Sequence, residues 1–308
     1  MKKKTINIIL CRKFDAWVGS ITDEAVKKLV EKNTIITGGS ITSMFLNEKV
    51  NDFDIYFRDK ETTLAVANYY VDLFTGNPPT RFKNDFGHCI PIEVKDEVDR
   101  VSIFIKSSGI ASEVGSNDYQ YFESTADDSL DATQFVEAVT SVLNEPAVTE
   151  NKGGKYRPVF LTDNAITLSD RIQIIIRFFG EPAIVHENFD FVHCTNFWDS
   201  RSRQLTLNVD AMVCAISKEL RYVGSRYPLC SVIRTSKFIQ RGWTINAGQM
   251  LKMMMQLSKL DLTDLAVLKE QLIGVDVAYF AEVLRKLGEK DASKVDGAYL
   301  IEIIDRMF

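Results

Sequence analysis

The spacing of apolar residues changes along the chain, and it predicts a mixed front part followed by a helical back part. Up to about residue 205, short β-branched or alternating runs typical of strands are interspersed with segments of helical period. The strands are expected at 34–37, 52–57, 90–95, 100–106, 157–161, 165–168 and 189–194, and the helices at 23–30, 41–46, 61–74, 135–143 and 170–179. The apolar run 6–10 predicts a short strand or the start of a helix.

Behind this part, the helical period dominates. Helices are expected at 209–223, 229–240, 247–257, 264–272, 278–287 and 297–307. We therefore predict an α+β fold, with a mixed sheet and flanking helices over 1–205 and an all-α domain over 206–308. Within the first domain, the segment of about 82–155 includes an acidic stretch without a clear period, which predicts an insertion.

Composition narrows the class of protein. The 308 residues fit one large or two ordinary domains, and 45% hydrophobic with 26% charged residues is typical of a globular protein. The net charge of -5 argues against a protein that coats nucleic acid non-specifically, although a local basic groove stays compatible with it. No apolar run approaches the roughly 18 residues of a membrane span, so no span is expected, and the cysteines are expected to be reduced core thiols of a cytoplasmic protein. The five widely spaced cysteines lack a C-x-x-C pair and indicate neither a disulfide framework nor a zinc site.

The first chemical signal is the sequence Gly38-Gly39-Ser40 between a predicted strand and a predicted helix. Two glycines let the backbone approach a bulky anion closely. The helix N-terminus behind them offers N–H groups and the positive end of the helix dipole, and Ser40 adds a hydroxyl donor. This turn is therefore predicted to bind the phosphates of a nucleotide.

The second signal is the pair Asp52 and Asp54 on the next predicted strand. Strand alternation points both carboxylates to one face, about 6–7 Å apart, with Phe53 and Ile55 on the other. Two such carboxylates repel each other unless a cation lies between them, and magnesium prefers oxygen ligands shared with phosphates. The pair predicts a site for two Mg²⁺ ions, with Mn²⁺ as a possible substitute.

The spacing of the two signals is compatible with one site. Eleven residues separate Ser40 from Asp52, enough for a short helix and a turn. The chain can then return as a neighbouring strand, so we expect the glycine turn and the carboxylates at one end of the same sheet.

Together, Gly38-Gly39-Ser40 and Asp52-Phe53-Asp54 resemble the signature of the DNA polymerase β-like nucleotidyltransferase superfamily. That superfamily includes poly(A) polymerases, CCA-adding enzymes and minimal nucleotidyltransferases. The resemblance covers about 20 residues and implies a palm-like sheet that transfers a nucleotide with magnesium. A weaker similarity is to nucleotidyltransferase-like proteins of large bacteriophages.

The resemblance also implies a third carboxylate on an adjacent strand. Asp190 is the favoured candidate as third catalytic and metal-binding residue, because it interrupts an apolar run. Glu93, inside a predicted strand, is the rival, and Asp99 in a charged turn is weaker.

A basic cluster lies in the helical part. Arg234, Lys237 and Arg241 fall on one face of a predicted helix and are candidates for binding the nucleotide or an RNA backbone. Tyr222 or Trp243 would stack on a base. The alternative is a solvated basic face without a ligand.

Three functions follow from these signals. The leading hypothesis is transfer of a nucleoside monophosphate from an NTP to an acceptor hydroxyl, with an RNA 3′ end such as that of tRNA favoured and pyrophosphate released. The helical domain would complete the cleft for nucleotide and acceptor. A second hypothesis keeps the chemistry but uses a protein, a small molecule or a nucleotide as acceptor, and a third is an inactive protein that binds nucleotide or RNA.

Overall fold

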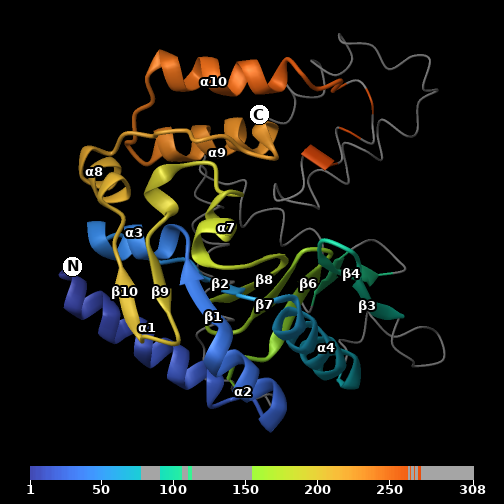
Figure 1. Ribbon diagram of the computed structural model, residues 1–308. Coiled ribbons are helices and arrows are strands. Elements are labelled where there is room, and N and C mark those ends of the chain that lie inside the picture. The colour runs from blue at the N-terminus through green and yellow to red at the C-terminus, as the bar shows by residue number, and fades with distance from the viewer. Residues whose placement is uncertain are drawn as a thin grey trace, which may run out of the picture. The chain divides into compact units, whose positions relative to one another are not determined.

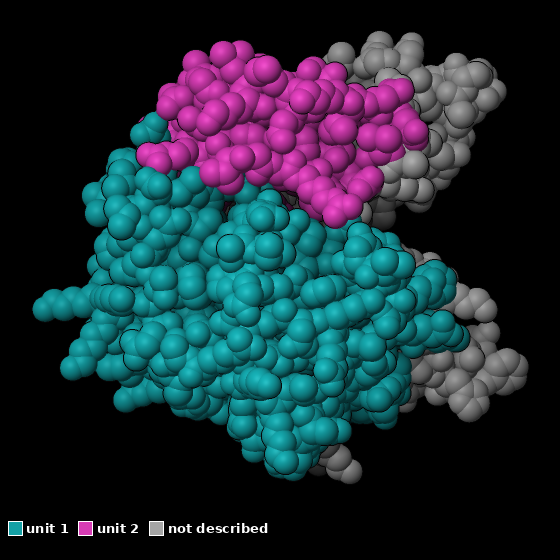
Figure 2. All heavy atoms as spheres, viewed as in Figure 1, with its two compact units in different colours: residues 1–114, 139–219 teal, residues 115–138, 220–308 magenta. Residues whose placement is uncertain are grey.

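The computed structural model describes residues 1–77, 91–105, 110–112 and 155–262, together with 264, 267, 270 and 271. By their contacts the residues form two compact units, 1–114 with 139–219 and 115–138 with 220–308, coloured separately in Figure 2. We had expected a division at 205, which falls inside a strand, whereas the units divide after Glu219.

The first unit is an α+β structure, as predicted (Figure 1). Its helices are α1 (Lys3–Val18), α2 (Glu24–Asn33), α3 (Gly39–Leu46), α4 (Lys60–Gly76), α7 (Pro182–His186), the 3₁₀ helix η2 (Val192–Cys194) and α8 (Val209–Ser217). Its strands are β1 (Thr34–Thr37), β2 (Phe53–Phe57), β3 (Ile92–Asp96), β4 (Val101–Ile105), β5 (Ile110–Ser112), β6 (Pro158–Thr162), β7 (Ala165–Leu168), β8 (Ile172–Phe179), β9 (Phe197–Asp199) and β10 (Gln204–Thr206).

Eight of these strands form one mixed sheet in the order β10-β9-β1-β2-β8-β7-β6-β5. The neighbours β1 and β2 are antiparallel, whereas β2 and β8 are parallel. The predicted hairpin of 90–95 and 100–106 is confirmed as the separate pair β3-β4. The end of β1 and the starts of β2 and β8 therefore meet at one end of the sheet, and the site is built there.

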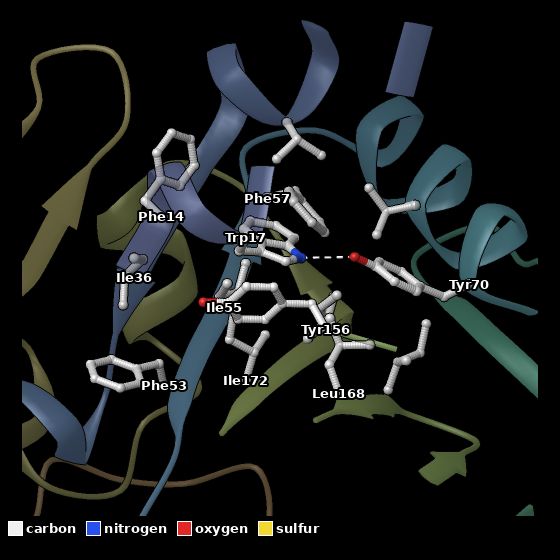
Figure 3. Packing of buried hydrophobic residues seen from close by; sticks show 14 of the residues in the cluster. Phe14, Trp17, Ile36, Phe53, Ile55, Phe57, Tyr70, Tyr156, Leu168 and Ile172 are labelled. Carbon is white, nitrogen blue, oxygen red and sulfur yellow. Dashed lines mark hydrogen bonds between the residues drawn. The ribbon is translucent and has the colours of Figure 1, made fainter. Parts of the chain in front are cut away.

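The main hydrophobic core covers one face of the sheet. Apolar residues of α1 to α4 pack there on the alternate strand positions that include Ile36, Ile55 and Ile172 (Figure 3). Near its middle, the indole N–H of Trp17 donates to the hydroxyl of Tyr70 at 2.8 Å. The other face carries a smaller cluster in which α7 covers β1 and β2.

Two predicted elements of this unit are wrong. The segment 170–179 was expected as a helix because its apolar residues fit a helical period, but 172–179 forms β8. The segment 189–194 was expected as a strand, yet it contains η2. The run 6–10, left open between strand and helix, lies in α1.

The described part of the second unit contains α9 (Pro228–Gln240) and α10 (Ala247–Leu257), which pack on each other. Both helices were predicted. The expected helix 209–223 is shorter, because α8 ends at Ser217 with Lys218 in the left-handed conformation. The expected helices 135–143, 278–287 and 297–307, and most of 264–272 and of the insertion 82–155, lie outside the described residues. Within the described ranges, no helix combines the length and apolar character that a membrane crossing requires.

Candidate active site

The glycine turn and the carboxylate strand form one structure, as the spacing predicted. Thr37, the last residue of β1, lies opposite Asp54 of β2 in the antiparallel register. Gly38 follows with a φ of 95°, which only glycine adopts without strain. A Cβ at Gly38 would lie 2.4 Å from Oδ2 of Asp54, so the carboxylate occupies the space that any side chain would need.

The next two residues present an open helix N-terminus. Gly39 begins α3, and a Cβ built on it would meet no atom within 4 Å. Ser40 is only 5% exposed, and among the described residues its hydroxyl has no hydrogen-bond partner. A buried hydroxyl without a partner costs about 1–3 kcal/mol, and an oxyanion bound at the helix N-terminus is the kind of group that satisfies it.

The segment around η2 holds this turn in place by hydrogen bonds. The N–H of Gly38 donates to the carbonyl of Cys194 at 3.2 Å. The hydroxyl of Thr42, in the first turns of α3, donates to the carbonyl of His193 at 2.6 Å. These bonds fix the glycine turn and the start of α3 against the η2 segment.

Asp54 faces away from the core. Its neighbours Phe53 and Ile55 are buried in the core cluster, which turns Asp54 to the opposite face of the sheet, where it is partly exposed. This alternation gives Asp54 the orientation that the sequence predicts, whereas Asp52, predicted on the same strand, precedes β2, which begins at Phe53.

Asp52 lies just before β2, in a segment that Arg171 hydrogen-bonds at two backbone positions. The N–H of Phe53 donates to the carbonyl of Arg171 at 2.9 Å, and Nη1 of Arg171 donates to the carbonyl of Val50 at 3.2 Å. Arg171 and the preceding Asp170 both have positive φ values, 61° and 63°, in the tight β7–β8 turn. A strained turn of this kind persists where the surrounding structure fixes it, which is common at functional sites.

The residues at this end of the sheet fit a magnesium ion shared with phosphates. Asp52 and Asp54 supply carboxylate oxygens, the hard ligands that magnesium prefers. The open space beside Gly39 and the hydroxyl of Ser40 would offer a place and a donor for the phosphates.

The predicted third carboxylate is not found beside them. Across the described ranges, no three His, Cys, Asp or Glu side chains lie close enough together to hold a metal ion, so Asp190 does not complete a group with Asp52 and Asp54. Asp190 is buried and precedes η2 rather than lying on a strand next to β2. Glu93 lies on β3, in the separate two-stranded sheet, and Asp99 in the turn before β4.

Sequence reasoning missed His186, a residue of α7 next to the site. Its Nε2 lies 2.9 Å from the hydroxyl of Thr37, which also donates to the carbonyl of Asn196 at 2.8 Å. Burial lowers the pKa of His186 to about 4, so the ring is neutral at pH 7. No sequence signal pairs a lone histidine with a strand that lies far away along the chain.

The basic cluster belongs to the second unit. Arg234 and Lys237 lie on α9 and are partly buried, whereas Arg241 caps the end of that helix with its guanidinium 5.5 Å from the ring of Phe238. The prediction that Tyr222 or Trp243 stacks on a base is not supported, because both side chains are buried, at 1% and 3% exposure. The three cations stay candidates for ligand binding.

Comparisons with known proteins give a family and distant relatives. A family model described as "Gabija anti-defense 2 family protein" matches residues 9–218, more than half of the chain. "Gabija anti-defense 2" of Bacillus phage SPbetaL7 is 19% identical over 255 residues, which are 82% of this chain but only 44% of that protein.

Among solved structures, two CCA-adding enzymes are similar to the chain. The enzyme of Thermotoga maritima, complexed with tRNA, has a TM-score of 0.36 and 12% identity over 90% of this chain and 53% of its own. The enzyme of Bacillus stearothermophilus, in complex with CTP, has a TM-score of 0.33 and 10% identity over 84% of this chain and 50% of its own. The chain thus spans about half the length of these proteins.

Proposed function

The chain belongs to the Gabija anti-defense 2 family, and we propose that it acts there as a magnesium-dependent nucleotidyltransferase of the DNA polymerase β-like superfamily. The observation that carries the proposal is the contact of Gly38 with the Asp54 carboxylate. It unites the phosphate-binding turn and the metal-binding strand at one end of one sheet.

Each part of the site has a role in the proposed reaction. The first turn of α3, with Gly39 and Ser40, holds the triphosphate of the NTP, and Asp52 and Asp54 hold the magnesium ions. Bound magnesium supplies activation of the attacking hydroxyl and stabilisation of the leaving pyrophosphate. The protein contributes mainly positioning and charge neutralisation, which suits a reaction whose bond changes occur on the substrates.

Two kinds of acceptor for the nucleoside monophosphate are compared. An RNA 3′ end is supported by Arg234, Lys237 and Arg241, but no longer by the buried Tyr222 and Trp243. The name of the phage relative describes an anti-defense protein, which favours a protein, RNA or nucleotide of a defence system as the acceptor. We propose that modification of such a component by a nucleoside monophosphate is the anti-defense activity.

The reaction is tested with α-labelled ATP, CTP, GTP and UTP in turn, with Mg²⁺, total tRNA and, separately, an extract of cells that express the Gabija system. Label in RNA, protein or a new nucleotide identifies the acceptor, and pyrophosphate is measured in parallel. Asp52→Asn and Asp54→Asn preserve side-chain size and are expected to lower the rate at least about 10³-fold. Equal rates in the wild type and both variants would refute the enzymatic proposal.

Gly39→Ala tests the phosphate-binding turn without disturbing the fold. A methyl group there meets no protein atom, so we expect unchanged stability. The same methyl group would enter the space assigned to the triphosphate and raise the KM for the NTP by about tenfold or more. An unchanged KM would place the triphosphate elsewhere.

The basic cluster is tested by Arg234→Ala/Lys237→Ala. If these cations bind RNA, labelling of tRNA falls about 3- to 10-fold while the KM for the NTP is unchanged, because each lost phosphate contact weakens RNA binding without altering the chemistry. Unchanged RNA labelling would leave the cluster as a solvated face.

A cell assay separates catalysis from binding. In cells that carry the Gabija system, the wild-type protein should restore phage growth and Asp54→Asn should not. Full restoration by Asp54→Asn, with normal amounts of protein, would favour the alternative of an inactive protein that acts by binding.

A further inference from the structure

One row of polar side chains crosses four neighbouring strands at the active end of the sheet. In register, Thr37 of β1 lies opposite Asp54 of β2, Asp54 beside Gln173 of β8, and Gln173 opposite Thr167 of β7. The next row points into the core and consists of four isoleucines: Ile36, Ile55, Ile174 and Ile166. The polar row is therefore confined to this end of the four strands, and the next row along the strands is apolar.

Gln173 shares the face of Asp54. Its neighbours Ile172 and Ile174 are both fully buried in the main core, so strand alternation turns Gln173 to the opposite face, where it is partly exposed. Asp54 faces the same way for the same reason. Residues in register on adjacent strands lie within reach of each other.

The other side of Asp54 is already committed to structure. The hydroxyl of Thr37 donates to the carbonyl of Asn196 and contacts His186, which fixes it between β1 and α7. Gln173 is therefore the side chain in this row that is placed to act together with Asp54.

We infer that the amide oxygen of Gln173 is a ligand, next to Asp54, for the metal ion of the site, which thus combines two carboxylates with a neutral amide. The inference rests on the proposed function. An amide carbonyl oxygen suits magnesium and manganese, and across the described residues no three His, Cys, Asp or Glu side chains lie close enough together to hold a metal ion. With one charge fewer, the ion is bound weakly until the phosphates of the NTP complete its ligands.

The test measures metal binding directly, without turnover. Mn²⁺ is titrated into the full-length protein with a non-hydrolysable NTP analogue, and free Mn²⁺ is followed by electron paramagnetic resonance. Gln173→Met removes the oxygen at similar volume and should weaken Mn²⁺ binding roughly tenfold. Gln173→Glu adds a charge and should strengthen it by about tenfold. Thr167→Val, in the same row but one strand further from Asp54, should leave the affinity unchanged.

Thermal unfolding provides the second readout. Without metal, Gln173→Glu places two carboxylates side by side and should lower the Tm, and Mn²⁺ should restore it more than in the wild type. Affinities of Gln173→Met and Gln173→Glu equal to the wild type, while Asp54→Asn loses binding, would overturn the role of Gln173 and leave the proposed function intact. Absence of Mn²⁺ binding by the wild type would overturn both.

Discussion

The two ends of the main sheet both gather charged and polar side chains, but they use them differently. Where β2 and β9 end, the Arg58 side chain is 6% exposed and bonds both Glu181 and Asp199, the latter at 2.7 Å. Where β1 ends and β2 begins, the Asp54 carboxylate lies beside Gly38 of the glycine turn, and Asp52 directly precedes β2.

The difference separates a charge cluster that the fold neutralises from one that we propose to bind a ligand. At the Arg58 end, opposite charges compensate each other, and the network ties α7 to β2 and β9. At the Asp54 end, carboxylates of like charge are combined with the N-terminus of α3 and the buried hydroxyl of Ser40. In the proposed function, a magnesium ion and the phosphates of a nucleotide compensate these groups.

Apart from the carboxylates themselves, the largest expected effect comes from Gly38→Ala at the Asp54 end. The positive φ costs alanine about 1–3 kcal/mol of stability, measured by urea unfolding. The new Cβ must also displace the Asp54 carboxylate, and a ligand moved by about 1 Å costs roughly 10²-fold in rate. Gly39→Ala is the matched control for stability. A Gly38→Ala variant with the wild-type rate would show that the position of Asp54 is not critical.

Arg58→Met at the other end should lower the stability of the protein without lowering the reaction rate. Loss of the Arg58 guanidinium leaves Asp199 without its main partner and costs about 2–3 kcal/mol of unfolding free energy. The rate per folded molecule stays unchanged. Arg201→Met, at a position 46% exposed, is the control and should cost under about 1 kcal/mol. A loss of rate in stable Arg58→Met would mean that the two ends are coupled.

The fold around the site was predictable because its signals are local. The strand 34–37, the glycine turn, the short helix and the strand 52–57 follow one another within a few turns of chain, and each has its own residue pattern. Their pairing then required only that a short connection joins neighbours.

Gln173, the proposed third ligand, could not be found from the sequence because the segment of β8 was predicted as a helix. Ile172, Ile174 and Ile176 point into the main core, while Ile175 packs on the other face, so the strand shows no polar alternation. Its isoleucines also satisfy a helical spacing. The β-branched composition was the signal that favoured a strand.

The wrong assignment had a consequence for the chemistry. On a helix, Gln173 has no relation to Asp54, whereas on a strand parallel to β2 the two are in register. Asp190 is favoured by the sequence because it interrupts an apolar run predicted as a strand, whereas the structure places η2 at Val192–Cys194. Pairings between segments more than a hundred residues apart depend on tertiary packing, which a local pattern does not contain.

A further expected effect concerns the pH dependence of stability, which also differs between the two ends. Because burial lowers the pKa of His186 to about 4, the unfolded chain binds a proton at this residue between pH 6.5 and 4 and the folded protein does not. Stability at the Asp54 end is therefore expected to fall as the pH drops through that window. His186→Gln, which still offers an N–H to Thr37, should remove this part of the pH dependence in urea unfolding.

Asp199, at the Arg58 end, affects stability in a lower pH range than His186. Burial raises the pKa of Asp199, but hydrogen bonds from Arg58, the N–H of Arg201 and the hydroxyl of Ser202 outweigh it and hold the pKa below its usual value. Its contribution is present above about pH 4 and is lost as the pH falls through the lowered pKa. The difference in unfolding free energy between wild type and His186→Gln should thus change only above pH 4, and that for Arg58→Met only below it. A His186→Gln difference that is constant from pH 7 to 4 would show that the histidine is not kept neutral by its burial beside Thr37.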